Sequence, residues 1–227
     1  MKIIFLGPPG AGKGTYSSRI GRALGIPHIS TGDIFREAVK QGNELGRQVS
    51  EYMKRGELVP DKVTIDVLKD RINQPDCERG FILDGYPRTI TQAEALEKVV
   101  KVEIIFNLII PEEILVKKLS ARRVCKVCGE NYNVAEIKET VGGVKYDMPP
   151  MLPKVSEICD RCGGELIQRR DDTIDVINER LSVYKKQTEP LIKYYRKKSL
   201  LSDVYVNAGP DTIVPKMIAK LKCLNSG

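Results

Sequence analysis

The sequence predicts an α/β protein in which a P-loop parallel-sheet core is flanked by helices and carries two inserts, one small and helical, the other β-rich and metal-bearing. Three observations lead to this prediction. Short apolar runs alternate with helical stretches, a glycine-rich loop follows the first run, and two C-x-x-C pairs interrupt the second half of the chain. The apolar runs expected to form strands are residues 2–6, 81–84, 103–109 and 203–206, with a further short strand at 27–29.

The glycine-rich loop is Gly7-Pro8-Pro9-Gly10-Ala11-Gly12-Lys13-Gly14-Thr15, and it joins the first apolar run to a helical stretch. Glycines let backbone N–H groups approach an anion closely, and the following helix directs its positive end at the same place. Lys13 can reach terminal phosphates, and the Thr15 hydroxyl can ligate Mg²⁺. A glycine-rich turn without a ligand is the alternative, which the lysine, the hydroxyl and the flanking elements disfavour. The loop therefore predicts binding of a nucleoside triphosphate.

Composition narrows the function classes. The chain has 227 residues and a net charge of +7, from 37 basic and 30 acidic residues. The basic residues are dispersed, which favours small polyanionic ligands over nucleic acid. No apolar window is long enough to span a bilayer, and the sequence opens on a strand that the loop needs, so neither a membrane segment nor a signal peptide is predicted. We expect a cytoplasmic protein, in which six cysteines favour metal ligation over disulfides.

The first half of the chain after the loop is predicted to be mainly helical. Ser30 or Thr31 can cap the first helix, and Pro60-Asp61 is a strong start signal for the third. Residues 30–60 are therefore expected to form a small helical insertion. His28, the only histidine, has no partner at metal or triad spacing, which favours a structural role. The expected helices are 31–40, 44–54 and 61–73.

Residues 80–88 form the second informative stretch, in which an apolar strand ends in Asp84 and a turn leads to Arg88. A carboxylate at this place suits Mg²⁺, usually through water, and open α/β sheets bind ligands at the carboxyl ends of their strands. A strand that ends in Asp-Gly is also an ordinary turn signal, so the interpretation depends on the phosphate loop. Downstream we expect a helix at 89–100 with Gln92 near its start, and another at 112–121.

Two near-copies of one knuckle follow, Cys125-Lys126-Val127-Cys128-Gly129 and Cys159-Asp160-Arg161-Cys162-Gly163. They predict a closed, structural tetrahedral site whose ligands are Cys125, Cys128, Cys159 and Cys162. Zinc is the favoured metal, and iron is the alternative that thiolates also accept. The 30 residues between the pairs exceed the usual spacing, so this loop is expected to carry its own strands with a turn at 141–144. Unligated thiols are disfavoured by the paired spacing.

The remainder of the chain is predicted to complete the core. A long helix is expected at 173–197 and presents Arg180, and a closing helix is expected at 211–223 after the strand at 203–206.

Taken together, these segments resemble the adenylate kinase family, of its long-lid, metal-bearing type, over essentially the whole chain. The order and spacing of the matching motifs are specific. They are G-P-P-G-A-G-K-G-T at 7–15, S-T-G-D-x-x-R at 30–36, D-G-Y-P-R-T-x-x-Q-A at 84–93, A-R-R-V at 121–124, R-R-D-D at 169–172 and the arginine at 180.

The resemblance implies a division into three parts. Residues 1–29, 61–121 and 173–227 would form the core, residues 30–60 an insert that binds AMP, and residues 122–172 a lid over ATP. It also implies reversible phosphoryl transfer from Mg-ATP to AMP, which yields two ADP, by a monomer without nucleic-acid or membrane partners. Structural Zn²⁺ would fold a lid too small to have a core of its own.

The resemblance assigns roles residue by residue. ATP would be held by Gly10, Ala11, Gly12, Lys13, Gly14, Thr15, Arg122, Asn131, Tyr132 and Pro210. AMP would be held by Thr31, Arg36, Glu57, Leu58, Val59, Gly85, Tyr86, Pro87, Arg88, Gln92, Arg169 and Arg180. Thr15, Asp33 and Asp84 would place Mg²⁺ and its waters. The groups expected to act on the transferring phosphoryl are Lys13, Asp84, Arg88, Arg122, Arg169 and Arg180.

The sequence departs from the family pattern, and rival functions stay open. Lys118 stands where many members have an arginine that touches the adenine of ATP, and the loop between the cysteine pairs is longer than in most members. The nearest rival is another nucleoside monophosphate kinase that uses UMP or CMP, against which Thr31 and Gln92 argue. A zinc-ribbon P-loop ATPase acting with nucleic acid is the rival from another class, for which the sequence offers no separate nucleic-acid module.

Overall fold

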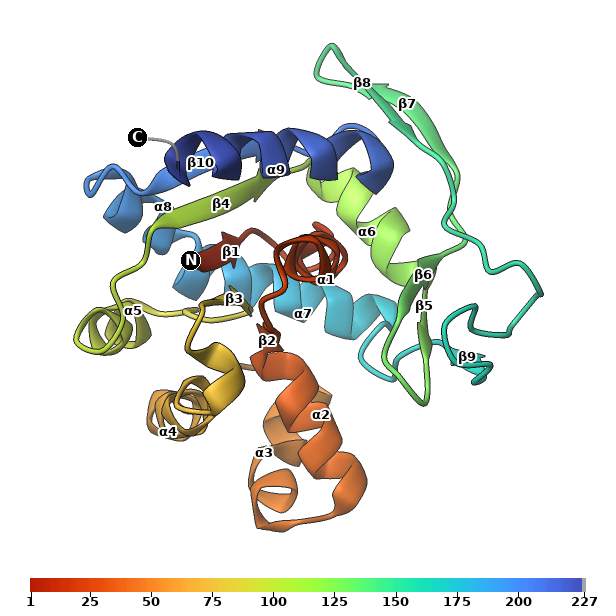
Figure 1. Cartoon of the computed structure of the whole chain (residues 1–227). Helices are drawn as coiled ribbons and strands as arrows, with labels where there is room; N and C mark the ends of the chain where they lie inside the picture. The colour runs from red at the N-terminus through yellow and green to blue at the C-terminus, as the bar shows by residue number, and fades with distance from the viewer. Residues whose placement is uncertain (226–227) are drawn as a thin grey trace.

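The computed structural model describes residues 1–225, and a five-stranded parallel sheet lies at its centre (Figure 1). The strand order is β10-β4-β1-β3-β2, so the glycine-rich loop leaves the central strand of the sheet. Every pair of neighbouring strands is parallel, which confirms the predicted α/β fold class. The strands are β1 (Lys2–Leu6), β2 (His28–Ser30), β3 (Phe81–Asp84), β4 (Ile104–Ile109) and β10 (Leu201–Tyr205).

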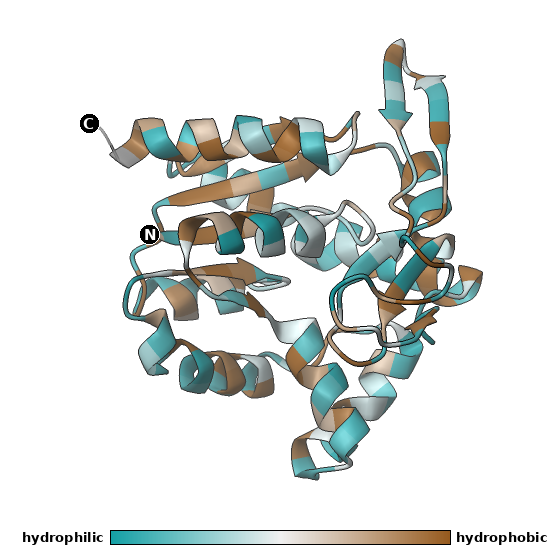
Figure 2. Cartoon of the chain, turned by 45° about the vertical axis from the view of Figure 1, so that its right-hand side comes forward, coloured by the Kyte–Doolittle hydropathy of each residue, from teal (hydrophilic) through white to brown (hydrophobic). Residues whose placement is uncertain are grey.

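Successive side chains of the central strand enter two apolar clusters, one on each face of the sheet. Ile3 and Phe5 belong to the first cluster, and Ile4 and Leu6 belong to the second. Figure 2 shows these strands as a hydrophobic layer between helices of mixed hydropathy. The first cluster is completed by α1 (Lys13–Leu24), α6 (Glu112–Ser120), α7 (Ile174–Val183) and α9 (Pro210–Asn225), and the second by α4 (Asp61–Ile72), η1 (Pro75–Cys77), α5 (Ile90–Glu97) and α8 (Pro190–Arg196). Within residues 1–225, no helix combines the length and apolar character that crossing a membrane requires.

Two helices form a separate lobe between β2 and α4. These are α2 (Thr31–Gln41) and α3 (Glu44–Arg55), as predicted. Each begins at a capping side chain: the Ser30 hydroxyl accepts from a backbone N–H of α2, and the Asn43 carboxamide does the same for α3. The two helices bury a small apolar cluster of their own around Phe35, Val49 and Val59.

The segment from 122 to 172 is rich in β-structure. The strands β5 (Arg122–Cys125), β6 (Asn131–Asn133) and β9 (Leu166–Ile167) form an antiparallel sheet in the order β6-β5-β9. The loop between the cysteine pairs forms β7 (Ile137–Val141) and β8 (Val144–Met148), which are joined by the turn predicted at 141–144. These two strands make a separate sheet rather than extending the first.

The prediction of one continuous helix over 173–197 is wrong at its centre. Helix α7 ends at Val183, a π-helical turn η2 (Tyr184–Thr188) follows, and α8 begins with Pro190. Proline has no N–H to donate to the preceding turn, and the wider turn instead pairs the Glu189 N–H with the Tyr184 carbonyl at 2.9 Å. Several element ends also differ: for example, α5 ends at Glu97 rather than at residue 100, β10 begins at Leu201 rather than at residue 203, and α9 ends at Asn225 rather than at residue 223.

Candidate active site

The phosphate loop joins β1 to α1 and turns on Gly10 and Gly12, whose φ angles are +84° and +95°. Glycine adopts this left-handed region without the clash that a side chain would cause. No side chain caps the N-terminus of α1, so its N–H groups can serve a ligand. The Lys13 ammonium donates to the carbonyls of Gly7 at 2.7 Å and Pro8 at 2.9 Å. Burial lowers the pKa of Lys13 to about 8, and a bound phosphate would stabilise its charged form.

A carboxylate from the neighbouring strand lies against this loop. Asp84 ends β3, and a Cβ atom built on Gly14 would lie 3.3 Å from its Oδ2 atom. His28, at the start of β2, places Nε2 3.4 Å from the same oxygen. Burial opposes protonation of His28, but the Asp84 carboxylate outweighs it and raises the pKa of the histidine. The partner of His28 is thus distant in sequence, and the pair holds the carboxylate at the edge of the sheet.

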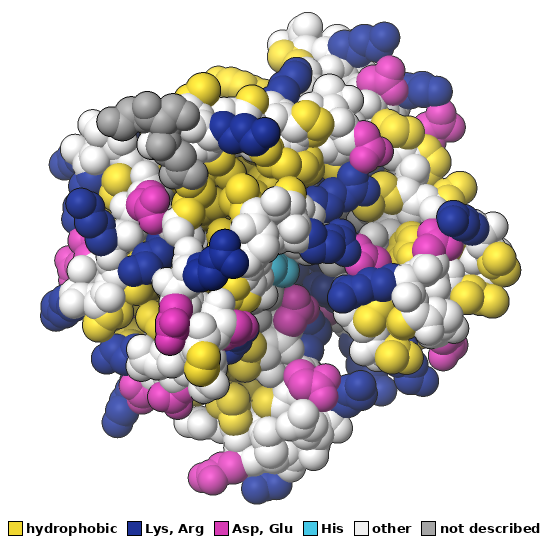
Figure 3. Space-filling model, in the orientation of Figure 1, with side chains coloured by type: hydrophobic (Ala, Val, Ile, Leu, Met, Phe, Trp, Pro, Cys, Tyr) yellow, Lys and Arg dark blue, Asp and Glu magenta, His cyan; other side chains and the backbone are white. Residues whose placement is uncertain are grey.

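The loop, the helical lobe and the β-rich segment face one cleft of about 930 Å³, which is partly open to solvent. Figure 3 shows Lys and Arg side chains gathered around the recess between the sheet core and the β-rich segment. The four arginines predicted to surround a transferring phosphoryl group all line this cleft, together with Lys13. The predicted residues that line it are Gly10, Gly12, Lys13, Gly14, Thr15, Asp33, Arg36, Asp84, Gly85, Arg88, Arg122, Asn131, Tyr132, Arg169 and Arg180.

Aspartates of the β-rich segment hold two of these arginines. Asp172 accepts two hydrogen bonds from Arg122, from Nε at 2.8 Å and from Nη2 at 2.5 Å. Arg180 lies 2.9 Å from Asp171 and 3.3 Å from Asp172. Burial lowers the pKa of Arg180 to about 10, which reflects the cost of enclosing several cations together. Asp171 and Asp172 belong to the R-R-D-D motif, but the sequence predicted no role for them; their adjacency to Arg169 and Arg170 was the available signal.

Arg169, another arginine of the cleft, links the helical lobe and the β-rich segment. Arg169, from the β-rich segment, lies 3.7 Å from Asp33 of the helical lobe, and Arg36 lies 2.5 Å from the same carboxylate. Burial alone would raise the pKa of Asp33, but these two cations lower it to about 2. Burial lowers the pKa of Arg169 to about 9. The carboxylate is therefore ionised, and it joins the lobe and the β-rich segment across the cleft.

A second cavity, of about 590 Å³ and also partly open to solvent, lies between the helical lobe and the sheet core. The Thr31 hydroxyl donates to the Gly85 carbonyl at 2.9 Å, which ties the lobe to the end of β3. The Gln92 carboxamide accepts from the Arg88 N–H at 2.8 Å and donates to Asp61 at 2.7 Å, so its orientation is fixed. The predicted AMP residues that line this cavity are Thr31, Arg36, Glu57, Leu58, Val59, Gly85, Arg88, Gln92 and Arg180.

Several predicted contacts are not on these surfaces. Ala11 and Tyr86 are buried, and the Tyr86 hydroxyl donates to the Gln92 carbonyl at 3.0 Å. Pro87 lines a smaller space behind Arg88. Pro210 begins α9 and is not among the residues that line the cleft or these cavities.

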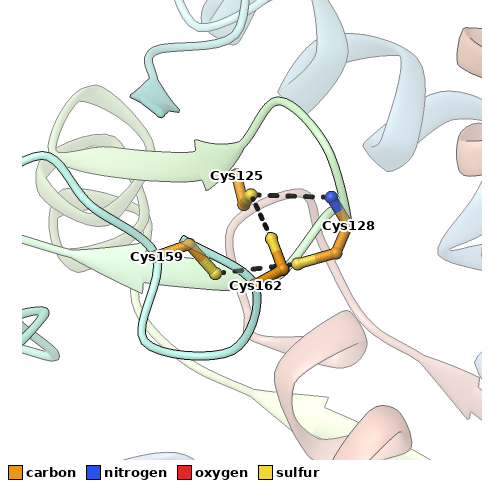
Figure 4. Close-up of side chains that lie close together, drawn as sticks. All are labelled: Cys125, Cys128, Cys159 and Cys162. Atoms are coloured by element: carbon orange, nitrogen blue, oxygen red, sulfur yellow. Dashed lines mark hydrogen bonds between the residues drawn. The ribbon is translucent and has the colours of Figure 1, made fainter. Parts of the chain in front are cut away.

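The four knuckle cysteines converge, and their Sγ atoms all lie within 4.8 Å of one another (Figure 4). The Sγ atoms of Cys125 and Cys162 are 3.4 Å apart, and those of Cys128 and Cys159 are 3.6 Å apart. Four sulfurs arranged tetrahedrally at the usual Zn–S distance of about 2.3 Å are separated by about 3.8 Å. The donor set and its spacing therefore fit one tetrahedral metal ion, and all four thiols are free of disulfides.

Neighbouring donors favour the thiolate form of two of these cysteines, Cys125 and Cys159. The Cys128 N–H points at the Cys125 sulfur at 3.5 Å, and the Arg161 N–H points at the Cys159 sulfur at 3.4 Å. The Tyr132 hydroxyl donates to Cys159 at 3.6 Å. Burial raises the pKa of Cys159, but these donors outweigh it and lower the pKa to about 6. Tyr132 was predicted to contact ATP; it lines the cleft, yet its hydroxyl faces the cysteine cluster.

These observations define the class of protein to which the chain belongs. A phosphate loop at the centre of a parallel sheet, a carboxylate on the adjacent strand and arginines from two inserts around one cleft are the features of a P-loop protein that handles phosphorylated ligands.

Comparison with known proteins narrows the class to one family. The family model described as adenylate kinase matches residues 5–200. A curated adenylate kinase of Archaeoglobus fulgidus is 51% identical over 209 residues, which cover 90% of each chain. The adenylate kinase of Acetivibrio thermocellus is 47% identical and covers 97% of this chain and 98% of its own, and that of Thermotoga maritima is 45% identical over 95% and 94%. The chain belongs to the adenylate kinase family.

Proposed function

We propose that this chain catalyses ATP + AMP ⇌ 2 ADP, with Mg²⁺ bound to the donor. The observation that carries the proposal is the convergence of Lys13, Arg88, Arg122, Arg169 and Arg180 on one cleft that opens between the phosphate loop and the second cavity. Phosphoryl transfer needs in-line positioning and stabilisation of spread negative charge rather than covalent chemistry, and clustered cations supply both.

We assign the donor nucleotide to the cleft and the acceptor to the second cavity. ATP phosphates would rest on the backbone of residues 10–15, with Asn131 at the lid side of the cleft. AMP would occupy the second cavity, where Gln92, locked by Asp61, presents a fixed hydrogen-bonding edge to adenine. Arg88 and Arg180 line both spaces, so they stand where the phosphoryl group would pass. The AMP phosphate is itself a nucleophile, so no general base is required.

Mg²⁺ is supported by the oxygen ligands beside the loop. Thr15, Asp33 and Asp84 line the cleft, and a few oxygens that leave room for water suit this ion. When bound, Mg²⁺ neutralises phosphate charge and orients the donor. The residues of this chain do the rest: Lys13 and the arginines hold the phosphates, and Asp171 and Asp172 hold Arg122 and Arg180 in place.

Closure of the two inserts would protect the reaction from water. We propose the core at 1–29, 61–121 and 173–227, the AMP-binding insert at 30–60 and the lid at 122–172. The contact between Arg169 and Asp33 supports closure, because it joins lid and insert across the cleft. Because water is the competing acceptor, a site completed only on closure limits ATP hydrolysis.

We also propose that the lid metal is zinc, and that the protein is a cytoplasmic monomer. The closed four-sulfur set favours zinc, with iron as the alternative that elemental analysis would distinguish. Free cysteines around a metal-type site suit a reducing compartment. Light scattering during size-exclusion chromatography tests the monomer, which predicts a mass near 25.4 kDa.

A coupled assay with ATP, AMP and Mg²⁺ tests the reaction. Lys13→Met and Arg88→Ala should each lower kcat/KM by about a thousandfold, because each removes a cation from the transferring phosphoryl. Lys98→Met and Arg79→Ala, at exposed positions, are the matched controls and should retain the wild-type rate.

An acceptor panel tests the AMP assignment. AMP should react at least a hundredfold faster than UMP or CMP; faster reaction with either pyrimidine nucleotide would replace this proposal with that of the rival kinase. ATP hydrolysis stimulated by DNA or RNA, without transfer to AMP, would favour the ATPase.

A further inference from the structure

The hairpin β7–β8 belongs to the lid segment by sequence and to the core by packing. Figure 1 shows it beside α6 and the start of α9, away from the sheet of β5, β6 and β9. Its inward side chains Ile137, Tyr146 and Met148 are only 4%, 6% and 5% exposed, and they lie in the main apolar cluster with residues of α6 and α9. The lid sheet instead has its own small cluster, which contains Cys125 and Tyr132.

Polar contacts fix the hairpin to the same part of the core. The Asp147 N–H donates to the Asn207 carbonyl at 2.9 Å, in the loop that precedes α9. The Lys117 ammonium of α6 lies 2.5 Å from Glu139. The hairpin therefore meets the core through side chains on one face and through backbone at its edge.

The neck of the hairpin is closed and tied to the point where the lid begins. Asn133 and Met151 exchange two backbone hydrogen bonds, at 3.1 and 2.8 Å. The Asn133 side chain also donates to the Lys118 carbonyl at 2.8 Å, and the Val134 N–H donates to the Ala121 carbonyl at 3.0 Å. These carbonyls lie at the C-terminal end of α6, immediately before β5. The neck is therefore fixed beside the first hinge of the lid.

We propose that the β7–β8 hairpin is a strap that stays docked on the core and limits how far the lid opens. This inference rests on the proposed function, because it assumes that residues 122–172 close over a donor nucleotide. A lid attached only at its two ends can swing freely about them. The strap adds a second attachment, and a wide opening would have to expose Ile137, Tyr146 and Met148 to water. Restricting the open state lowers the entropy lost on closure, so the strap favours tight binding of ATP.

The double variant Tyr146→Ala/Met148→Ala tests the strap by removing its anchors. We expect backbone amides of β5 and β6 to exchange hydrogen at least tenfold faster without nucleotide, and KM for ATP to rise about fivefold. KM for AMP should stay within twofold of the wild type. The matched control is Thr140→Ala/Lys145→Ala, a cross-strand pair on the exposed face of the same hairpin, which should change neither quantity. Unchanged exchange and unchanged KM for ATP in the anchor variant would overturn the proposal.

A second variant tests the same proposal if Tyr146→Ala/Met148→Ala no longer unfolds cooperatively and is therefore not properly folded. Asp147→Pro removes the N–H that reaches Asn207 and removes no hydrogen bond of the hairpin ladder, because this N–H points away from β7; proline's fixed φ is compatible with an edge strand. A twofold to threefold rise in KM for ATP supports the strap, and an unchanged value counts against it. If the wild type transfers no phosphoryl group to AMP, the proposed function fails by itself, and hydrogen exchange in the lid still decides whether the strap acts.

Discussion

The helical insert and the lid are kept folded by different interactions. The helical insert buries Phe35, Val49 and Val59 between its helices and the adjoining core, so an apolar cluster keeps it folded. The apolar cluster of the lid sheet is built from Cys125, Cys159, Tyr132 and Leu166, and two of these four buried residues belong to the four-cysteine cluster that suits a metal ion. Four buried side chains remove too little apolar surface from water to offset the chain entropy of the lid sheet. The helical insert thus has an apolar core, whereas the lid sheet has four cysteines that suit a metal ion, and we propose that a bound metal stabilises the lid in place of such a core.

Removal of the metal should have the largest effect, and it should affect the lid but not the helical insert. After the metal is displaced by a thiol-reactive mercurial and chelated, we expect amides of β5, β6 and β9 to lose protection from hydrogen exchange, and activity to fall at least a hundredfold. The reason is that structural zinc contributes on the order of 10 kcal/mol to folding in small zinc domains. Amides of α2 and α3 should keep their protection. Hydrogen exchange followed by mass spectrometry measures both inserts in one sample.

Elemental analysis of the untreated protein is the control for this experiment, and about one zinc per chain is expected. Restoring Zn²⁺ under reducing conditions should restore both protection and activity. If the lid amides stayed protected in metal-free protein, side-chain packing would hold the lid and the contrast between the inserts would disappear.

A cavity in the helical insert should produce the next largest effect. Val49→Ala removes two methyl groups from a side chain with no exposure and should lower the free energy of unfolding by about 2 kcal/mol. KM for AMP should rise several-fold, while KM for ATP and metal content should stay unchanged. Val39→Ala, the same substitution at an exposed position of α2, is the matched control and should cost little. Chemical denaturation and steady-state kinetics measure these quantities; a matching rise in KM for ATP would mean that the inserts are not independent.

The contrast also explains which features could be predicted from the sequence. Some features need particular residues at a fixed local spacing, and these could be predicted from the sequence. They are the phosphate loop, the strand that ends in Asp84 and the cysteine knuckles. The partners of the site residues are distant in sequence, as Asp84 is from His28 and Asp61 is from Gln92, and local patterns do not predict such pairs. The docking of the β7–β8 hairpin was missed for the same reason, since its alternation predicts strands and not the surface they cover. The π-helical turn was missed although Pro190 was visible, because a helical pattern continues on both sides of it.

Removing an ion pair between the core and the lid should have the smallest effect on KM for ATP. This test shows whether surface charge helps to hold the lid. Arg22 of α1 lies 3.2 Å from Glu130 beside the first knuckle, and its side chain is 52% exposed. Solvent screens such a pair, so Arg22→Ala should change the free energy of lid closure by at most about 0.5 kcal/mol. KM for ATP should therefore change less than about twofold, and high salt should remove the difference. Lys54→Ala, which breaks an exposed pair with Glu51 inside the other insert, is the matched control and should leave KM for ATP unchanged. A tenfold rise in KM for ATP in Arg22→Ala would mean that surface charge, and not only the cysteine cluster and the docked hairpin, holds the lid.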